Sequence, residues 1–126
     1  MGAVDNNSML LLQKSLDYAW QKQRMINMNI ANAETPGYKA RYLTFEDELK
    51  HNLRGTEGKY NQVRAAIKNS HIRVKTRKEE SMRLDGNNVN TDVENIELAR
   101  TQLQYEYLIR QMNDQIARLR IVIEGR

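Results

Sequence analysis

Apolar residues recur at alternating steps of three and four residues in two long stretches, one toward each end of the 126-residue chain. The first stretch comprises Met9, Leu12, Leu16, Ala19, Gln23, Ile26, Ile30 and Ala33. The second comprises Leu98, Gln102, Tyr105, Ile109, Met112, Ile116, Leu119 and Ile123. This spacing is that of a coiled-coil seam, interrupted once in each stretch by a glutamine. The sequence therefore predicts two long amphipathic helices at opposite ends of one domain.

The two seams are most simply buried against each other. We expect a mainly α fold in which the N-terminal and C-terminal helices pair as an antiparallel coiled coil, with a small irregular middle segment between them. Burial of a leucine or isoleucine side chain stabilises by about 1.5–3 kcal/mol, so seams of this length make a slender structure with a small core. The expected neighbours are Ala33 and Leu98, Ile26 and Tyr105, Leu16 and Ile116, and Met9 and Ile123.

The first seam must stop at the only proline of the chain. Pro36 disfavours helical dihedral angles at Thr35, and Gly37 tolerates the positive φ that the third position of a type II turn requires. We expect a flexible leader over 1–7, a helix over 8–34 and then this turn. Turn chemistry alone occurs in every fold class, so by itself it indicates an ordinary helix stop. The predicted turn motif consists of Asn29, Asn32, Thr35, Pro36, Gly37 and Tyr38.

A second strong turn signal, Asp85-Gly86-Asn87-Asn88, precedes the second seam. Directly after it, the run Thr91-Asp92-Val93-Glu94 fits a capping box, in which Thr91 is the N-cap and the Glu94 carboxylate reaches back to it. We therefore expect the C-terminal helix over 91–126. The predicted return turn and cap consist of Asp85, Gly86, Asn87, Asn88, Thr91 and Glu94.

The middle segment, over 35–90, is the basic part of the chain. Residues 38–84 contain 12 Lys or Arg against 6 Asp or Glu, in a chain of formal net charge +4. Such an imbalance suits nucleic acid, an anionic surface or an acidic partner subunit, and a solvated basic surface is the plain alternative.

Local patterns in this segment predict small elements. Thr44 is a plausible N-cap for a short helix that repeats apolar residues every four positions. The spacing of Tyr60, Val63 and Ile67 permits a second short helix. Alternation from His71 to Arg77, continued at Met82 and Leu84, indicates a small hairpin. A hairpin of this size must pack on a helix or on a neighbouring molecule to be stable.

Both long helices also carry apolar residues away from their seams, among them Leu11 on the first and Ala99 on the second. Two paired helices cannot bury both sets. We therefore expect these residues to contact the middle segment or other subunits. The candidates for subunit contact are Trp20, Met25, Met28, Ile96, Leu103 and Tyr107.

Residue patterns typical of catalytic and metal sites are missing from the sequence. There is no cysteine, which excludes thiolate metal sites and a disulfide framework. His51 and His71 have no ligand-spaced partner, and the three acids at 46–48 suit the start of a helix. We expect no enzyme activity, cofactor, metal or small-molecule substrate. Neither a cleaved secretory signal nor a membrane span is expected.

The twelve residues Asn29-Ile30-Ala31-Asn32-Ala33-Glu34-Thr35-Pro36-Gly37-Tyr38-Lys39-Ala40 resemble the N-terminal signature of the bacterial flagellar axial proteins, the rod and hook components. The run from Leu84 to Asn90, followed by a helix through Leu98-Ala99 and Leu103-Gln104-Tyr105, is similar to the proximal rod proteins of that family. The resemblance covers both terminal helices and their turns but not the middle. Asn90 stands where aspartate is expected in many relatives, and asparagine caps a helix comparably.

The resemblance implies a structural subunit of the proximal rod, the part of the drive shaft that crosses the periplasm, required for motility. It implies export by the flagellar type III apparatus without cleavage of a signal. The implied partners are copies of the chain, other rod proteins, and the membrane-ring and rod-base proteins. In this family the terminal helices pair into a coiled coil.

Two other functions remain open at the level of the sequence. Another axial component of the same family would be expected to have a long insert and a different C-terminal signature, so the short middle favours the proximal rod. A nucleic-acid-binding helical hairpin could use the basic residues from Lys39 to Arg83. Aromatic residues are few there, and salt-dependent affinity for DNA or RNA would be its mark.

Overall fold

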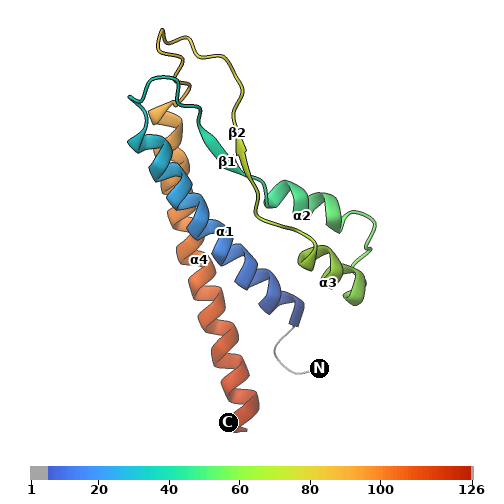
Figure 1. The fold of residues 1–126 in the computed structure, drawn as a ribbon. Helices are drawn as coiled ribbons and strands as arrows, with labels where there is room; N and C mark the ends of the chain where they lie inside the picture. The colour runs from blue at the N-terminus through green and yellow to red at the C-terminus, as the bar shows by residue number, and fades with distance from the viewer. Residues whose placement is uncertain (1–5, 126) are drawn as a thin grey trace.

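A computed structural model describes residues 6–125 of the chain (Figure 1). Its elements in order are α1 (Asn6–Ala31), β1 (Arg41–Leu43), α2 (Glu46–Leu53), α3 (Tyr60–Lys68), β2 (Val74–Thr76) and α4 (Thr91–Glu124). The helix α1 begins two residues before the expected start and ends three before the expected end. Residues 1–5 of the expected leader lie outside the described residues.

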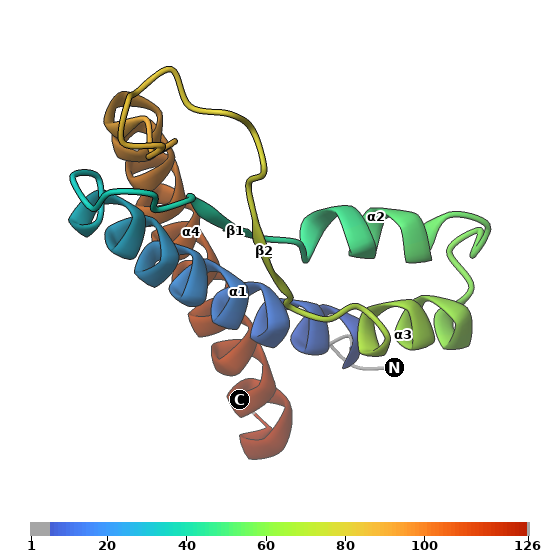
Figure 2. The ribbon, with the colours of Figure 1, turned by 45° about the horizontal axis from the view of Figure 1, so that its top comes forward.

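The helices α1 and α4 run antiparallel and pack against each other, which confirms the predicted fold class (Figure 1). The two helices lie closest where α1 ends and α4 begins, and they diverge toward the other end of the pair (Figures 1 and 2). Their side chains meet at Lys22 and Glu97, with Nζ and Oε2 3.4 Å apart, and at Asn29 and Glu94, with Nδ2 and Oε2 3.3 Å apart.

The register of this pair differs from the prediction. Ile26 lies with Glu94 and Glu97 around one small cavity, whereas the seams predicted Tyr105 as its neighbour. The residues of α4 that contact a given residue of α1 therefore lie about two helical turns closer to the N-terminus of α4 than predicted. The physical reason is the return turn: it is hydrogen-bonded to the end of α1, so α4 must begin beside Asn29, whatever the apolar stripes favour.

The buried stripe of α4 also differs from the predicted seam. Leu98, Tyr105 and Met112 are partly buried as expected, but the stripe continues through Glu94 and Thr101 rather than through Gln102 and Ile109. The Thr101 hydroxyl donates to the Glu97 carbonyl at 2.7 Å, which satisfies this buried polar group within the helix. Four apolar seam residues stay more than a third exposed, namely Ile109, Ile116, Leu119 and Ile123.

The middle segment forms a side arm that begins with a short two-stranded ribbon and ends in α2 and α3 (Figure 2). The strands β1 and β2 are antiparallel, with Arg41 opposite Thr76 and Leu43 opposite Val74. The antiparallel strand pair in the middle segment therefore exists, but the expected contribution of Met82 and Leu84 was wrong. Both of these side chains are fully exposed, and the strand that pairs with β2 is β1.

The side arm is attached to α1. Lys14 of α1 donates from Nζ to the carbonyls of Ile67, Lys68 and Ser70 at 2.7, 2.9 and 2.9 Å, so its ammonium group caps the end of α3. Phe45 is buried and lies 5.3 Å from Tyr18, measured between ring centroids. The expected Thr44 cap was wrong: Phe45 occupies the N-cap position of α2 and makes no side-chain cap bond, because its ring packs into the core.

Candidate assembly surfaces

The first turn ends α1 through a proline and a glycine. The Tyr38 amide donates to the Thr35 carbonyl at 3.2 Å, and Gly37 has a φ of 73°, so the backbone has the geometry of a type II turn. The Thr35 hydroxyl donates to Asn32 Oδ1 at 3.0 Å, which fixes the segment before the proline.

The return turn is joined to the first turn by Asn87, which is completely buried. Its Nδ2 donates to the carbonyl of Asn32 at 2.8 Å and to that of Thr35 at 2.9 Å. Its Oδ1 accepts from the Val89 amide at 2.8 Å. One side chain therefore occupies carbonyls that the end of α1 leaves without helical partners, and also orders the chain that enters α4.

Asn88 makes a second set of bonds between the turns. Its amide donates to the Tyr38 carbonyl at 3.2 Å, and its Oδ1 accepts from the Ala40 amide at 2.6 Å. Below these bonds Ala33, Ala40 and Val89 form a small apolar cluster with Tyr38. The two turns are thus a single packed unit, called here the junction (residues 32–40 and 83–90).

Asn29 ties the junction to the ribbon and to α4. It is 1% exposed, and its Nδ2 donates to the Arg41 carbonyl at 2.8 Å and to Glu94 Oε2. Its Oδ1 accepts from the Arg41 amide at 3.0 Å and from the Tyr38 hydroxyl at 3.3 Å. The amide group of one asparagine therefore aligns the end of α1, the start of β1 and the first turn of α4.

The predicted Thr91 capping box is wrong. Asn90 is the N-cap of α4, and its Oδ1 accepts from the Asp92 and Val93 amides at 3.1 and 3.3 Å. Thr91 is exposed, and Glu94 is buried against Asn29 instead of reaching back to the cap. Asn90 stands one position before Thr91, and its strong capping preference decided the helix start.

Two basic side chains close the junction from outside. Arg83 donates to the Ala33 carbonyl and pairs with Asp85 and Glu34, at 3.0 and 3.3 Å between nitrogen and oxygen. Lys39 donates to the Gly86 carbonyl. Neither residue was among the predicted site residues, because each binds a carbonyl that lies 50 or 47 residues away in sequence.

The candidates for subunit contact are mostly exposed. The exposed fraction is 48% for Trp20, 44% for Met28, 60% for Ile96, 67% for Leu103 and 61% for Tyr107, whereas Met25 is partly buried. On α1 the Arg24 guanidinium carbon lies 4.9 Å from the centroid of the Trp20 ring. Together with Met25 and Met28 these side chains surround a shallow hollow of about 310 Å³. The long helices therefore present apolar surfaces that the chain itself leaves uncovered.

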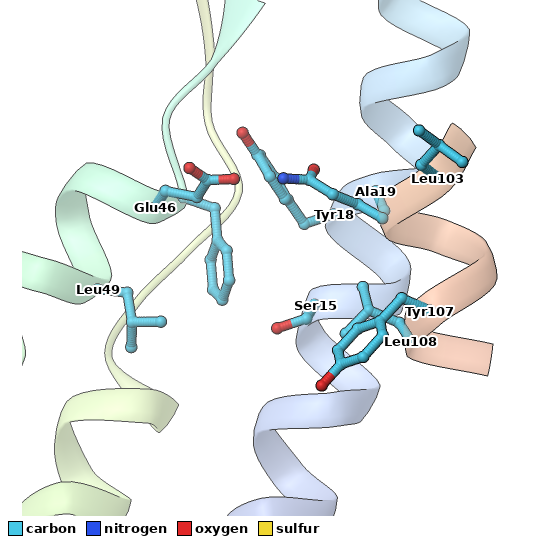
Figure 3. A pocket seen from close by; sticks show the side chains of 10 residues that line it. Ser15, Tyr18, Ala19, Glu46, Leu49, Leu103, Tyr107 and Leu108 are labelled. Carbon is cyan, nitrogen blue, oxygen red and sulfur yellow. The ribbon is translucent and has the colours of Figure 1, made fainter. Parts of the chain in front are cut away.

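A larger groove lies where α1, α2 and α4 meet (Figure 3). Figure 3 shows Leu49 on the α2 side, Tyr18 and Ala19 on α1, and Leu103, Tyr107 and Leu108 on α4. The groove has a volume of about 400 Å³, and Glu46 lies on its rim. The pKa of Tyr18 is raised, first by burial and then by the negative charges of Glu46, Asp47 and Glu97. The groove is thus an apolar surface in an acidic environment. Its remaining lining residues are Ser15, Phe45 and Gln104.

Across the described residues 6–125, no helix combines the length and apolar character of a membrane span. The same residues contain no group of three or more histidine, cysteine or acidic side chains arranged to hold a metal ion.

Comparison with known proteins identifies the family of the chain. No family model matches the chain. The chain is 33% identical over 117 residues to the flagellar basal body rod protein FlgB of Bacillus subtilis, covering 90% of this chain and 91% of that protein. It is 31% identical to FlgB of Escherichia coli, covering 90% of each, and 34% identical to FlgB of Cereibacter sphaeroides, covering 82% of this chain and 84% of that protein. The chain therefore belongs to the FlgB family and is a structural subunit of the flagellar basal-body rod.

Proposed function

We propose that the chain is a proximal rod subunit that assembles in the periplasm through the exposed apolar surfaces of α1 and α4. The observation that carries this proposal is the exposure of Trp20, Met28, Ile96, Leu103 and Tyr107 on helices of a chain related to named rod proteins. Large apolar side chains that stay exposed in an isolated chain are typical of surfaces that other subunits cover.

The partners in this proposal are copies of the chain, other rod proteins, and the ring and rod-base proteins at the membrane. The subunit reaches them by the flagellar type III export apparatus, without a cleaved signal. It has no catalytic activity and binds neither nucleic acid nor a small-molecule substrate. Its contribution is mechanical and lies in how its helices are held.

The junction supports this role because it fixes where the side arm leaves the helix pair. Buried Asn29 and Asn87 join both turns to the ends of α1 and α4 through hydrogen bonds of 2.8–3.3 Å. Assembly surfaces on the helices and on the arm therefore keep one relative orientation from copy to copy, which a regular polymer requires.

The test is complementation of a strain from which the gene for this chain has been deleted. The tagged chain should restore swimming and be recovered in isolated basal bodies. The double variant Leu103→Ser, Tyr107→Ser should keep the helix content of the monomer but be lost from basal bodies, because both side chains are exposed and their removal leaves no cavity.

Two controls separate assembly from folding. Gln62→Ser, at an exposed polar position on α3, should swim normally. Ile26→Asp should fail for another reason, loss of the folded monomer, because Ile26 is 4% exposed and a carboxylate there would be buried without a partner. Normal swimming of the deletion strain, or absence of the wild-type chain from basal bodies, would refute the proposed function.

A further inference from the structure

The last part of α4 carries an apolar stripe that no described element covers. Beyond Leu108 the seam continues through Ile109, Ile116, Leu119 and Ile123, whose exposed fractions are 37, 42, 38 and 74%. Ile121 and Val122 beside it are each 53% exposed. The apolar side chains keep the spacing of a coiled-coil seam. This spacing is typical of a helix face that packs into a groove of another element.

The groove between α1, α2 and α4 is the complementary feature. Its walls are apolar, and Leu49, Leu103 and Tyr107 line it from opposite sides (Figure 3). A volume of about 400 Å³ admits the side chains of a docked helix while its backbone stays at the opening. The same chain thus presents both an uncovered helix stripe and an uncovered groove.

The stripe cannot enter the groove of its own chain. α4 is one continuous helix over Thr91–Glu124, and the groove is lined by its own residues Leu103, Tyr107 and Leu108. The residues that follow continue along the same axis and move away from the groove by about 1.5 Å per residue. Only a second copy can therefore bring the stripe to the groove.

Charge favours this pairing. Glu46 lies on the rim of the groove, and Asp47 is the next residue in sequence. The pKa of Tyr18 is raised by burial and also by the negative charges of these two carboxylates. The end of α4 carries Arg118 and Arg120 next to the apolar stripe, and both are exposed. Opposite charges facing each other across an interface fix register and suppress wrong partners.

We propose that the end of α4 (residues 109–123) of one copy docks into the groove between α1, α2 and α4 of the next. This inference rests on the proposed function, since it names one contact among the surfaces that assemble the rod. Each copy offers one stripe and one groove, so the contact joins different surfaces of the two copies, and its repetition in one direction builds a helical or ring assembly.

Cysteine cross-linking tests this contact directly, because the natural chain contains no cysteine. A chain with Leu49→Cys in the groove is mixed with a chain with Ile116→Cys on the stripe and oxidised. We expect a disulfide-linked dimer from this mixture. The matched controls are Asp114→Cys, on the opposite face of the same part of α4, and Lys50→Cys, which neighbours Leu49 but does not line the groove. Either control should reduce the yield at least tenfold.

A charge exchange provides the second measurement. Glu46→Arg and Arg120→Glu should each weaken self-association in sedimentation, and the two changes together in one chain should restore it at least in part. The proposed contact would be overturned if the controls cross-linked as well as the test pair or if no cross-link formed. It would also be overturned if the double charge variant self-associated more weakly than either single variant. If the Ile116→Asp variant still enters basal bodies and supports swimming, the contact is wrong while the rod function stands. Loss of the wild-type chain from basal bodies would instead refute the function itself.

Discussion

The amide of Gly37 donates a hydrogen bond to the carbonyl of Asp85 at 2.7 Å, so the turn that leaves α1 and the turn that enters α4 lie back to back. Gly86 follows so closely that a Cβ built on it would lie 3.8 Å from the Gly37 Cα. The 47 residues between Gly37 and Asp85 therefore leave and return at nearly one point, and the stability of this point decides how the side arm is held.

Asn87 should be the most sensitive polar residue of the junction. Asn87→Ala removes three hydrogen bonds, each worth about 1 kcal/mol, so we expect the free energy of unfolding to fall by about 3 kcal/mol. Urea denaturation followed by circular dichroism measures the change. Asn61→Ala, at an exposed position on α3, is the control and should cost less than about 0.5 kcal/mol. Equal losses in both variants would contradict the role given to Asn87.

Gly37 should be needed for its backbone conformation and not for lack of space. Its φ is 73°, and nothing lies within 4 Å of a Cβ built on it. We expect Gly37→Ala to lower the free energy of unfolding by about 1–2 kcal/mol, because an L-residue pays this in the left-handed region. Gly37→Asn should lose less, since asparagine tolerates this region better. The comparison of the two midpoints in urea checks the prediction, and a larger loss for asparagine would argue for a steric cause.

Lys14 should hold α3 on α1. Lys14→Met removes three hydrogen bonds to carbonyls at the end of α3, and we expect opening of α3 to become easier by about 2 kcal/mol. Hydrogen exchange of the backbone amides in α3 measures this, with amides near Asn29 as the internal reference. Lys22→Met is the matched control, because Lys22 contacts no residue of α3: it forms a partly exposed ion pair with Glu97, worth about 0–1 kcal/mol, and its ammonium group lies 5.8 Å from the centroid of the Tyr18 ring. Unchanged exchange in α3 would show that the ribbon and Phe45 alone hold the arm.

Glu48 should make the attachment of α2 dependent on pH. The pKa of its carboxyl group is lowered, chiefly by the hydrogen bond from Arg73, with Nε and Oε2 3.1 Å apart, and also by bonds from His71. A carboxyl group whose pKa is lower in the folded state stabilises the fold at pH values above its ordinary pKa of 4.5. This contribution is lost as the pH falls through the folded-state pKa. We expect Glu48→Gln to remove that acid-dependent step, measured by NMR titration of the residues around Arg73. A step that persists in the variant would assign it to another carboxylate.

The fold class and the paired helices could be predicted because apolar periodicity is a local property that tertiary contacts seldom reverse over such lengths. The register could not, because it depends on Asn87 reaching back to the carbonyls of Asn32 and Thr35, and spacing along a seam carries no information about such a bond. The pairing of β2 with β1 was not predicted for the same reason. The strand Arg41–Leu43 is too short to show alternation, and its pairing depends on where the first turn ends.

The candidate assembly surfaces and the junction likewise combine features that the sequence predicts with features that it does not. Exposure of Leu103 and Tyr107 followed from counting apolar faces, since two helices cannot cover two stripes each. Asn29 and Asn87 were recognised as turn residues, but their complete burial was not visible, because asparagine is usually a surface residue and its burial depends on partners distant in sequence. The choice of Asn90 over Thr91 as cap depended on a shift of one residue, the scale on which sequence patterns are least informative.

Among the described helices and strands, only α1 packs closely along α4. A twist or pull applied to the end of α4 therefore reaches the side arm by two routes (Figure 2). One crosses the α1–α4 contact and follows α1 to Lys14, and the other passes through the junction to the ribbon, where Asn88 Nδ2 donates to the Arg77 carbonyl at 3.1 Å. A load that passes through the junction is carried by the hydrogen bonds of two buried asparagines, Asn29 and Asn87.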